Sequence, residues 1–508
     1  MRNVHGPPLL QLALDLGDRR IETDTGWQVV PPGADPVAAV RARDTRIHPE
    51  SRLLAPSTEV ATSRAPLLAV LFAVCALATA WIAARPPRVL RTHAPEAVLV
   101  AVTVFWMLVY AVKGTRMPVA LGFDAHAHLL YIDYLIEHHT PPTAAYGFST
   151  YHPPVFHALA ALLVGATGVT PDSAAGPAVY RLVPMLSGLS TVWLTFGVAR
   201  RIWPGRSLRP ALAVGTAGLL PMNVYMAAYV SNEALHATWV SGALLLATAL
   251  IAAPRLSLRR ALALGGVLGL GLLTKFTSLA VAPLIAAFAA ARVWLVDDRG
   301  PARALGLGVG LLGIAFAISG WFYVRNWILF GDPVVWNLDV PGAARWWMLP
   351  GFHTIAAYTT FGESLVHPFF AGFASFWDGV YSTLWADGLV AGMIRVATRH
   401  PYWRYDLMTL IPVLALPATA LGVLGFGRLV VASLREPSAS RRLILSMVTT
   451  LLFVLSFSLL FITLRLPFYA QAKAPYVLAA TLPLSLCAAE GLAWVPQRLL
   501  PTRAGLFA

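Results

Sequence analysis

One short stretch of the sequence gathers side chains that could move a proton at a membrane surface. Asp124 is followed one helical turn later by His128, so on a helix the carboxylate and the imidazole would share a face. A carboxylate held by a neighbouring imidazole can act as a general base or help to bind a metal. Asp is also a favoured residue at the start of a helix, so the spacing also allows a simple capping role for Asp124.

Histidine is concentrated in the same region. Six of the thirteen histidines of the chain lie within it, namely His126, His128, His138, His139, His152 and His157. This pattern fits a metal site or a proton relay, and it also fits interfacial histidines that face water. No cysteine accompanies them and no strict ligand spacing is present, so a divalent metal is left open, with His126, His128 and Glu233 as the candidate ligands.

Two further charged residues stand in apolar surroundings, where a charge is costly unless it has a partner or a function. Glu233 follows Asn232 where one apolar run ends and the next begins, and Lys275 is a lone cation between apolar residues. The alternatives are a turn capped by Asn232 for the first and a lysine that snorkels to the headgroups for the second. Arg325 and Lys473 are cations on loops that we predict to face outward, where an anionic phosphate would account for them.

The composition requires that these residues be carried by a membrane protein. Of 508 residues, 57% are hydrophobic and 12% are charged, against about 25% charged residues in soluble domains. A chain this apolar needs the bilayer as its solvent. The net charge of +14 comes from short basic clusters between apolar runs, which is typical of cytoplasmic loops and not of nucleic-acid binding.

The apolar runs predict an all-α polytopic membrane domain over 66–508, preceded by a polar tail at 1–65 that we expect to be disordered. A membrane-spanning helix needs about 20 residues. The Gly-rich stretch 265–269 lies inside one run and indicates close helix packing. About eleven transmembrane helices are expected, near 66–84, 94–112, 179–199, 210–230, 234–252, 261–274, 277–295, 304–323, 406–430, 443–463 and 475–495.

The basic clusters fall in alternate loops, which predicts that those loops are cytoplasmic and that the large loops 113–178 and 324–405 face outward. Within the first of these loops, the apolar segment 153–168 would give a helix of about 24 Å, too short for a bilayer core of about 30 Å. If it crossed, every later basic loop would fall outside. We therefore expect it to lie on the outer surface of the membrane.

Taken in order along the chain, several short motifs resemble those of the GT-C superfamily of glycosyltransferases. Within it, the chain is most similar to the group of protein O-mannosyltransferases and lipid A aminoarabinose transferases. The resemblance covers about residues 94–495. The motifs are Asp124, His152-Pro153-Pro154, Tyr180-Arg181-Leu182, Ser231-Asn232-Glu233, Gly271-Leu272-Leu273-Thr274-Lys275-Phe276, and Arg325-Asn326-Trp327 followed by Gly331-Asp332-Pro333.

The resemblance implies a GT-C bundle with membrane-parallel helices in the first outer loop. It also implies transfer of a hexose or pentose from a polyprenyl-phosphate donor to a hydroxyl of a lipid, glycan or protein. The reaction would take place on the extracytoplasmic face of the cell membrane, as part of building the cell envelope. Asp124 would be the general base. The residues expected to bind substrate are His128, His152, Asn232, Glu233, Lys275, Arg325 and Lys473.

The chain departs from the family pattern at two places. The family often has Asp-Glu where this sequence has Asp124-Ala125, and the aminoarabinose transferases have Glu-Lys-Pro where it has Tyr151-His152-Pro153. Both departures remove a carboxylate, which puts a metal-assisted reaction and the aminoarabinose activity in doubt. The alternative functions are a non-catalytic transporter or flippase of lipid-linked sugars, and a GT-C polysaccharide polymerase or ligase. A transporter would tolerate Asp124→Asn and an enzyme of this kind would not.

Overall fold

The computed structural model describes residues 12–15, 18–23, 26–29, a few residues between 61 and 73, and then 88–336, 353–392, 403–467 and 471–499. Most of the predicted tail and of the predicted 66–84 helix therefore lies outside the described residues. Within the tail, three short strands form an antiparallel meander: β1 (Leu12–Asp15), β2 (Asp18–Thr23) and β3 (Gly26–Val29).

From residue 88 onward the described chain is helical. The long helices are α3 (Arg88–Val109), α6 (Gly176–Ile202), α9 (Glu233–Ile251), α10 (Leu258–Leu272), α11 (Ser278–Leu295), α12 (Pro301–Phe330), α17 (Leu416–Arg435), α18 (Ala439–Arg465) and α19 (Thr481–Leu499). The shorter helices are α4 (Ala125–His138), α5 (Val155–Thr167), α7 (Leu208–Leu219), α8 (Pro221–Ala227), α13 (Glu363–Val366), α14 (Phe376–Trp385), α15 (Tyr405–Met408) and α16 (Ile411–Leu414). A π-helical turn, η2 (Tyr110–Gly114), extends α3, and a 3-10 segment, η9 (Ala474–Ala480), leads into α19.

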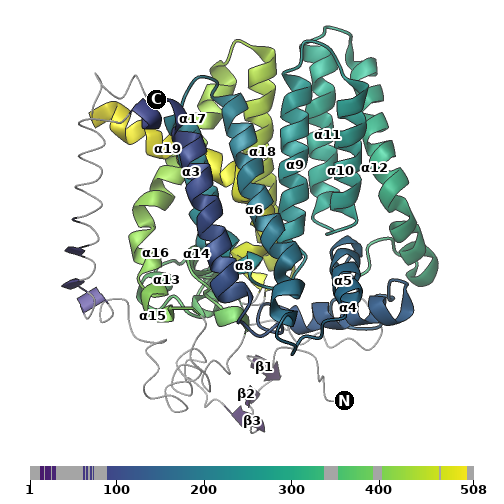
Figure 1. Ribbon diagram of the computed structural model, residues 1–508, viewed down its shortest axis with the longest axis vertical. Coiled ribbons are helices and arrows are strands. Elements are labelled where there is room, and N and C mark those ends of the chain that lie inside the picture. The colour runs from purple at the N-terminus through teal and green to yellow at the C-terminus, as the bar shows by residue number, and fades with distance from the viewer. Residues whose placement is uncertain are drawn as a thin grey trace.

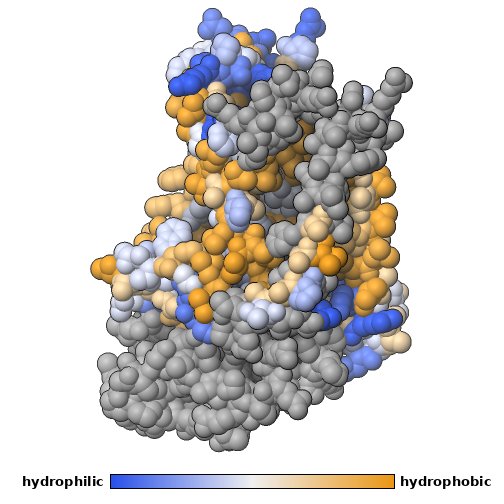
Figure 2. Space-filling view, turned by 90° about the vertical axis from the view of Figure 1, so that its left-hand side faces the viewer, coloured by the Kyte–Doolittle hydropathy of each residue, from blue (hydrophilic) through white to orange (hydrophobic). Residues whose placement is uncertain are grey.

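Among the residues that the structure describes, eight helices are long and apolar enough to cross a membrane. They are α3 with η2, α6, α9, α11, α12, α17, α18, and η9 with α19. Large apolar side chains such as Val104, Phe316 and Phe453 are more than half exposed on their outer surfaces. Figure 2 shows the resulting hydrophobic band across one face, with hydrophilic residues above and below it. The chain is thus a helical membrane protein, while the expected total of about eleven spans stays a prediction.

The helix predicted over 210–230 is wrong as a single element. It is divided into α7 and α8, because Leu220 adopts an extended conformation before Pro221. Proline has no amide hydrogen and disfavours the helical conformation of the residue before it, so it begins a new helix here. The run at 406–430 is divided in the same manner into α15, α16 and α17, with Pro412 in the first turn of α16.

The two ends of the bundle differ in what they carry. The short connections that follow α6, α9, α11 and α17 lie at the upper end in Figure 1. The first three carry Arg206, Arg255 and Arg299, and Arg435 is the last residue of α17, just before the fourth, in line with the alternation of basic loops. The lower end carries α4, which lies across the bundle, and α5, which lies beneath α10 (Figure 1). Helix α5 has 13 residues, or about 20 Å, so it is short, as expected for the 153–168 segment.

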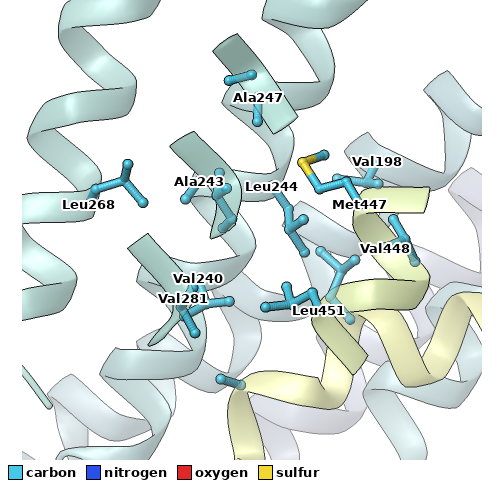
Figure 3. Close-up of a cluster of buried hydrophobic side chains, with 14 of the residues drawn as sticks. Val198, Val240, Ala243, Leu244, Ala247, Leu268, Val281, Met447, Val448 and Leu451 are labelled. Atoms are coloured by element: carbon cyan, nitrogen blue, oxygen red, sulfur yellow. The ribbon is translucent and has the colours of Figure 1, made fainter. Parts of the chain in front are cut away.

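Close approach of backbones holds the bundle together. A Cβ atom on Gly491 of α19 would stand 1.7 Å from the Leu421 carbonyl oxygen of α17, so only glycine fits this crossing. On α10, a Cβ atom on Gly269 would lie 2.9 Å from the Ala315 carbonyl oxygen of α12, which confirms that the Gly-rich stretch packs helices. Figure 3 shows the apolar core, where side chains such as Leu244 and Leu451 meet.

Candidate functional site

Asp124 stands at the start of α4, but its side chain does not cap the helix. It makes no capping hydrogen bond, and its backbone is left-handed, with a φ of 55°. Asp tolerates this conformation better than most residues, although it remains strained. The preceding turn needs Gly122, whose φ is 140° and whose Cβ, if present, would stand 2.7 Å from Cβ of Tyr229. The half-buried carboxylate is therefore held in place by the backbone and available for another role.

Arg181 secures the loop that carries Asp124. This fully buried side chain on α6 donates hydrogen bonds to the carbonyl oxygens of Met117 (2.6 Å) and Ala228 (2.6 Å), and also to that of Pro118. It thereby joins the segment after η2 to the end of α8. The sequence offered only a weak signal for this role, an arginine near the start of a predicted span, and we named it only as part of a motif.

Three histidines of the loop 113–178, which the sequence predicts to face outward, pack together. Nδ1 of His128 lies 2.9 Å from Nε2 of His157, and the His128 ring stacks on both His157 and His152. Burial lowers the pKa of His128 to about 4, with Lys275 lowering it further and Asp124 opposing the change. Burial also lowers the pKa values of His152 and His157 well below the usual range. Burial thus favours the neutral form of all three rings.

Glu233 and Lys275, which the sequence could only place in apolar surroundings, form a buried ion pair. The Lys275 ammonium also donates to the Tyr476 carbonyl oxygen at 3.2 Å. Next to them, the Asn232 amide donates to the Thr274 carbonyl oxygen at 3.0 Å and makes no capping hydrogen bond. Lys275 therefore does not snorkel, Asn232 does not cap, and the start of α9 is fastened to the turn between α10 and α11.

Lys473 is a buried cation of a different kind. The residue is 6% exposed, and its ammonium lies 5.0 Å from the centre of the Phe123 ring and 4.4 Å from that of the Tyr476 ring. In the part of the chain that the structure describes, no carboxylate forms an ion pair with it. Two aromatic faces partly compensate a cation, but its charge is not neutralised. The site thus has one neutralised lysine and one lysine that can receive an anion.

These groups converge on one region at the lower end of the bundle. Phe123, which lies under the Lys473 ammonium, is the residue directly before Asp124. Burial raises the pKa of Tyr151 well above its usual range, and Tyr476, Asp124 and Glu233 raise it further, which places these groups around one phenol. Trp336, which follows α12, also reaches this region, with its ring centre 6.3 Å from that of Tyr151.

The remaining expectations are met less well. Arg325 donates to the Pro141 carbonyl oxygen at 2.8 Å, so it supports the loop 113–178 and does not join the lysines. Among the described residues, no group of three or more His, Cys, Asp or Glu side chains is placed to hold a metal. His126 is exposed and His128 is buried, since residues two apart on a helix face different ways, and Glu233 is paired with Lys275. The three candidate metal ligands are therefore not brought together.

A second buried carboxylate, which the sequence did not reveal, supports the site from the loop 324–405. Asp387 accepts hydrogen bonds from the Tyr229 hydroxyl and from the Ala391 amide, each at 2.7 Å. The Tyr229 ring packs edge-on against Phe123 at 5.7 Å. Asp387 thus helps to hold the loop of Asp124 in place, because it fixes Tyr229, which packs against Phe123. No local pattern in the sequence could have linked residues so far apart.

Comparison with known proteins gives a likeness of fold alone. No protein-family model and no curated protein matches the sequence. An oligosaccharyltransferase of Archaeoglobus fulgidus, solved with zinc and sulfate, is 16% identical, with a TM-score of 0.45 over 81% of this chain and 50% of that chain. ArnT from Cupriavidus metallidurans bound to undecaprenyl phosphate is 16% identical, with a TM-score of 0.37 over 80% of this chain and 79% of that chain. This chain thus spans about half of the length of the archaeal enzyme.

Proposed function

We propose that this protein is a membrane glycosyltransferase that transfers a sugar from a polyprenyl-phosphate donor to an acceptor hydroxyl. The observation that carries the proposal is the meeting of two groups at one end of an apolar bundle. Asp124 provides a carboxylate that caps nothing, and Lys473 provides a buried ammonium without a carboxylate partner among the described residues. A base for a hydroxyl and a cation for a phosphate are what such a transfer requires.

In this mechanism Asp124 removes the proton of the acceptor hydroxyl while its oxygen forms a bond to the anomeric carbon of the sugar. The bond between that carbon and the phosphate oxygen breaks, and the phosphate leaves with the electron pair. Lys473 stabilises the negative charge that develops on the phosphate, because its ammonium is already desolvated. The Glu233–Lys275 pair and the Asn232–Thr274 hydrogen bond hold the adjoining helix ends in position.

The sequence motifs support the same assignment through their resemblance to GT-C enzymes, and the alternation of basic loops supports an extracytoplasmic site in the cell membrane. The acceptor would be a hydroxyl of a lipid, a glycan or a protein of the cell envelope. A transporter would need no base, and the free Asp124 carboxylate therefore favours the enzyme.

The test begins by identifying the lipid that purifies with the protein by mass spectrometry and using the corresponding polyprenyl-phosphate sugar as donor. Asp124→Asn should reduce turnover by about a hundred- to ten-thousand-fold, the usual worth of general-base catalysis. Folding should be retained, because the carboxylate makes no capping hydrogen bond. Asp133→Asn, the same change on the exposed face of α4, is the control and should cost little. Wild-type turnover in Asp124→Asn would contradict the mechanism.

Lys473 is tested separately through donor use. A charge-assisted contact is worth about 1.5–3 kcal/mol, so Lys473→Met should weaken donor use by roughly 10- to 150-fold and leave the fold intact. The longer arginine side chain would restore part of the loss, because it keeps the charge. Equal donor kinetics for Lys473→Met and the wild type would show that the donor phosphate does not bind at Lys473.

A further inference from the structure

The backbone on both sides of Lys473 is in contact with α14, a helix of the loop 324–405. The Ala474 amide, directly after Lys473, donates a hydrogen bond to the Thr383 hydroxyl at 2.8 Å. Directly before Lys473, the Ala472 carbonyl oxygen lies so close to α14 that a Cβ atom on Gly379 would stand 2.4 Å from it. The helix therefore fixes the chain where the lysine leaves it.

The Thr383 hydroxyl that accepts this hydrogen bond is itself held in place. It donates to the Gly379 carbonyl oxygen at 2.7 Å, one turn earlier in α14, while it accepts from the Ala474 amide. The hydroxyl thus uses its hydrogen and one of its lone pairs. Thr383 and Ala474 are both buried, and a buried amide that loses its acceptor is costly. The contact therefore ties the segment of Lys473 to one defined place on α14.

The backbone carbonyl of Thr383 supports the aromatic ring that the lysine contacts. It accepts a hydrogen bond from the Tyr225 hydroxyl, and the Tyr225 ring packs edge-on against Phe123, with the two ring centres 6.2 Å apart. Phe123 is the ring whose centre lies 5.0 Å from the Lys473 ammonium. One residue of α14 therefore holds both the chain that carries the ammonium and a tyrosine that packs on the ring beneath it.

We propose that Thr383 is a positioning residue for the donor phosphate, which sets the Lys473 ammonium over the Phe123 ring without touching the substrate. This inference rests on the proposed function, in which Lys473 binds that phosphate. The place of the ammonium matters because a charge-assisted hydrogen bond is short and directional. Without the Thr383 hydroxyl, the buried Ala474 amide would lack an acceptor, and we expect the segment that carries Lys473 to shift until the amide finds another.

The first arm of the test reads the hydrogen bond in the full-length protein and needs no substrate. Thr383→Val removes the hydroxyl and keeps the shape of the side chain, so the Ala474 amide should exchange its hydrogen faster in hydrogen–deuterium exchange mass spectrometry. Thr383→Ser keeps the hydroxyl and should exchange like the wild type. Lys275 still holds the Tyr476 carbonyl oxygen in both variants, so η9 should stay folded. Unchanged exchange in Thr383→Val would overturn the inference.

The second arm measures the binding of farnesyl phosphate, a short polyprenyl phosphate without a sugar, to the purified protein. Thr383→Val should raise its Kd about 3- to 10-fold, the worth of one hydrogen bond, and Thr383→Ser should restore the wild-type value. The matched control is Thr449→Val on α18, because the hydroxyl of this buried threonine donates only to carbonyl oxygens of its own helix, at Leu445 and Ser446. This control should leave the Kd unchanged.

A double-variant cycle separates positioning from a general loss of structure. If Thr383 acts through Lys473, adding Thr383→Val to Lys473→Met should weaken binding no further, because the ammonium that it positions is gone. An additive loss would mean that Thr383 only supports the fold, and it would overturn the inference, as would wild-type binding by Thr383→Val or a wild type that does not bind farnesyl phosphate. A wild type that binds this phosphate but transfers no sugar from a polyprenyl-phosphate donor would instead contradict the proposed function and leave the positioning of Lys473 in place.

Discussion

Removing Lys275 should destabilise the protein, because the change would leave a carboxylate buried without its counter-charge. In the ion pair each side chain is about 10% exposed, and the second oxygen of Glu233 is already buried without a partner. Breaking such a pair from one side costs about 3–5 kcal/mol, a large part of the 5–15 kcal/mol by which proteins are typically stable. Lys275→Met should therefore lower the unfolding temperature of the purified protein clearly.

The matched control is the double variant Glu233→Gln, Lys275→Met, which removes both charges together. Replacing a buried ion pair by uncharged side chains is often neutral, so the double variant should recover most of the lost stability in the same thermal scan. The sequence analysis expects Lys275 to bind substrate, and on that view its loss would weaken donor use without unfolding the protein. If Lys275→Met proves as stable as the wild type and only donor use falls, the Glu233–Lys275 pair does not stabilise the fold, and the donor phosphate binds at Lys275 instead.

Four further outcomes are expected. Stability should fall as pH drops from about 6.5 toward 4, because His128, His152 and His157 have lowered pKa values in the folded state and bind protons on unfolding. Each histidine should contribute about 1 kcal/mol per pH unit to the free energy of unfolding. Thermal scans of His157→Gln at several pH values should show a weaker dependence of the unfolding temperature on pH. Gly491→Ala should cost at least about 1–3 kcal/mol, since its Cβ would stand 1.7 Å from a carbonyl oxygen, while Gly427→Ala, with nothing within 4 Å, should be harmless in the same assay. A cysteine at the exposed position Ala145 should react with an impermeant thiol reagent on intact cells and one at Arg206 should not; the reverse pattern would invert the topology. Arg181→Lys should reduce the yield of folded protein, measured by size-exclusion chromatography, because one ammonium cannot reach all the carbonyl oxygens that the guanidinium contacts.

The bundle was predictable because its signal is local. A run of apolar residues predicts a membrane helix wherever it falls, and α6, α9, α11, α12 and α18 lie close to their expected positions. The errors arose where one proline divides a run that is otherwise long enough, as at Pro221. Hydropathy averages over a window, so it does not register the loss of a single amide hydrogen.

The candidate site was predictable in its members but not in their pairing. Asp124, Glu233, Lys275 and Lys473 each stood out as a charge near an apolar run. Which lysine meets Glu233 depends on the packing of α9 against the turn after α10, and the sequence treats both lysines alike. The role of Asp387 depends on a contact with Tyr229, 158 residues earlier, and no local pattern carries that information.

The distribution of the charged residues along the chain has a consequence for biogenesis. Glu233 and Lys275 are 42 residues apart, so the pair can form as soon as α9, α10 and α11 have entered the membrane, which spares the growing chain two isolated charges in lipid. Lys473, in contrast, reaches the ring of Phe123, the neighbour of Asp124, only when η9 and α19 have been synthesised and packed. A chain that lacks this packing would hold the Glu233–Lys275 pair but not the Lys473 ammonium at the Phe123 ring. We therefore expect the proposed activity to require the packing of η9 and α19.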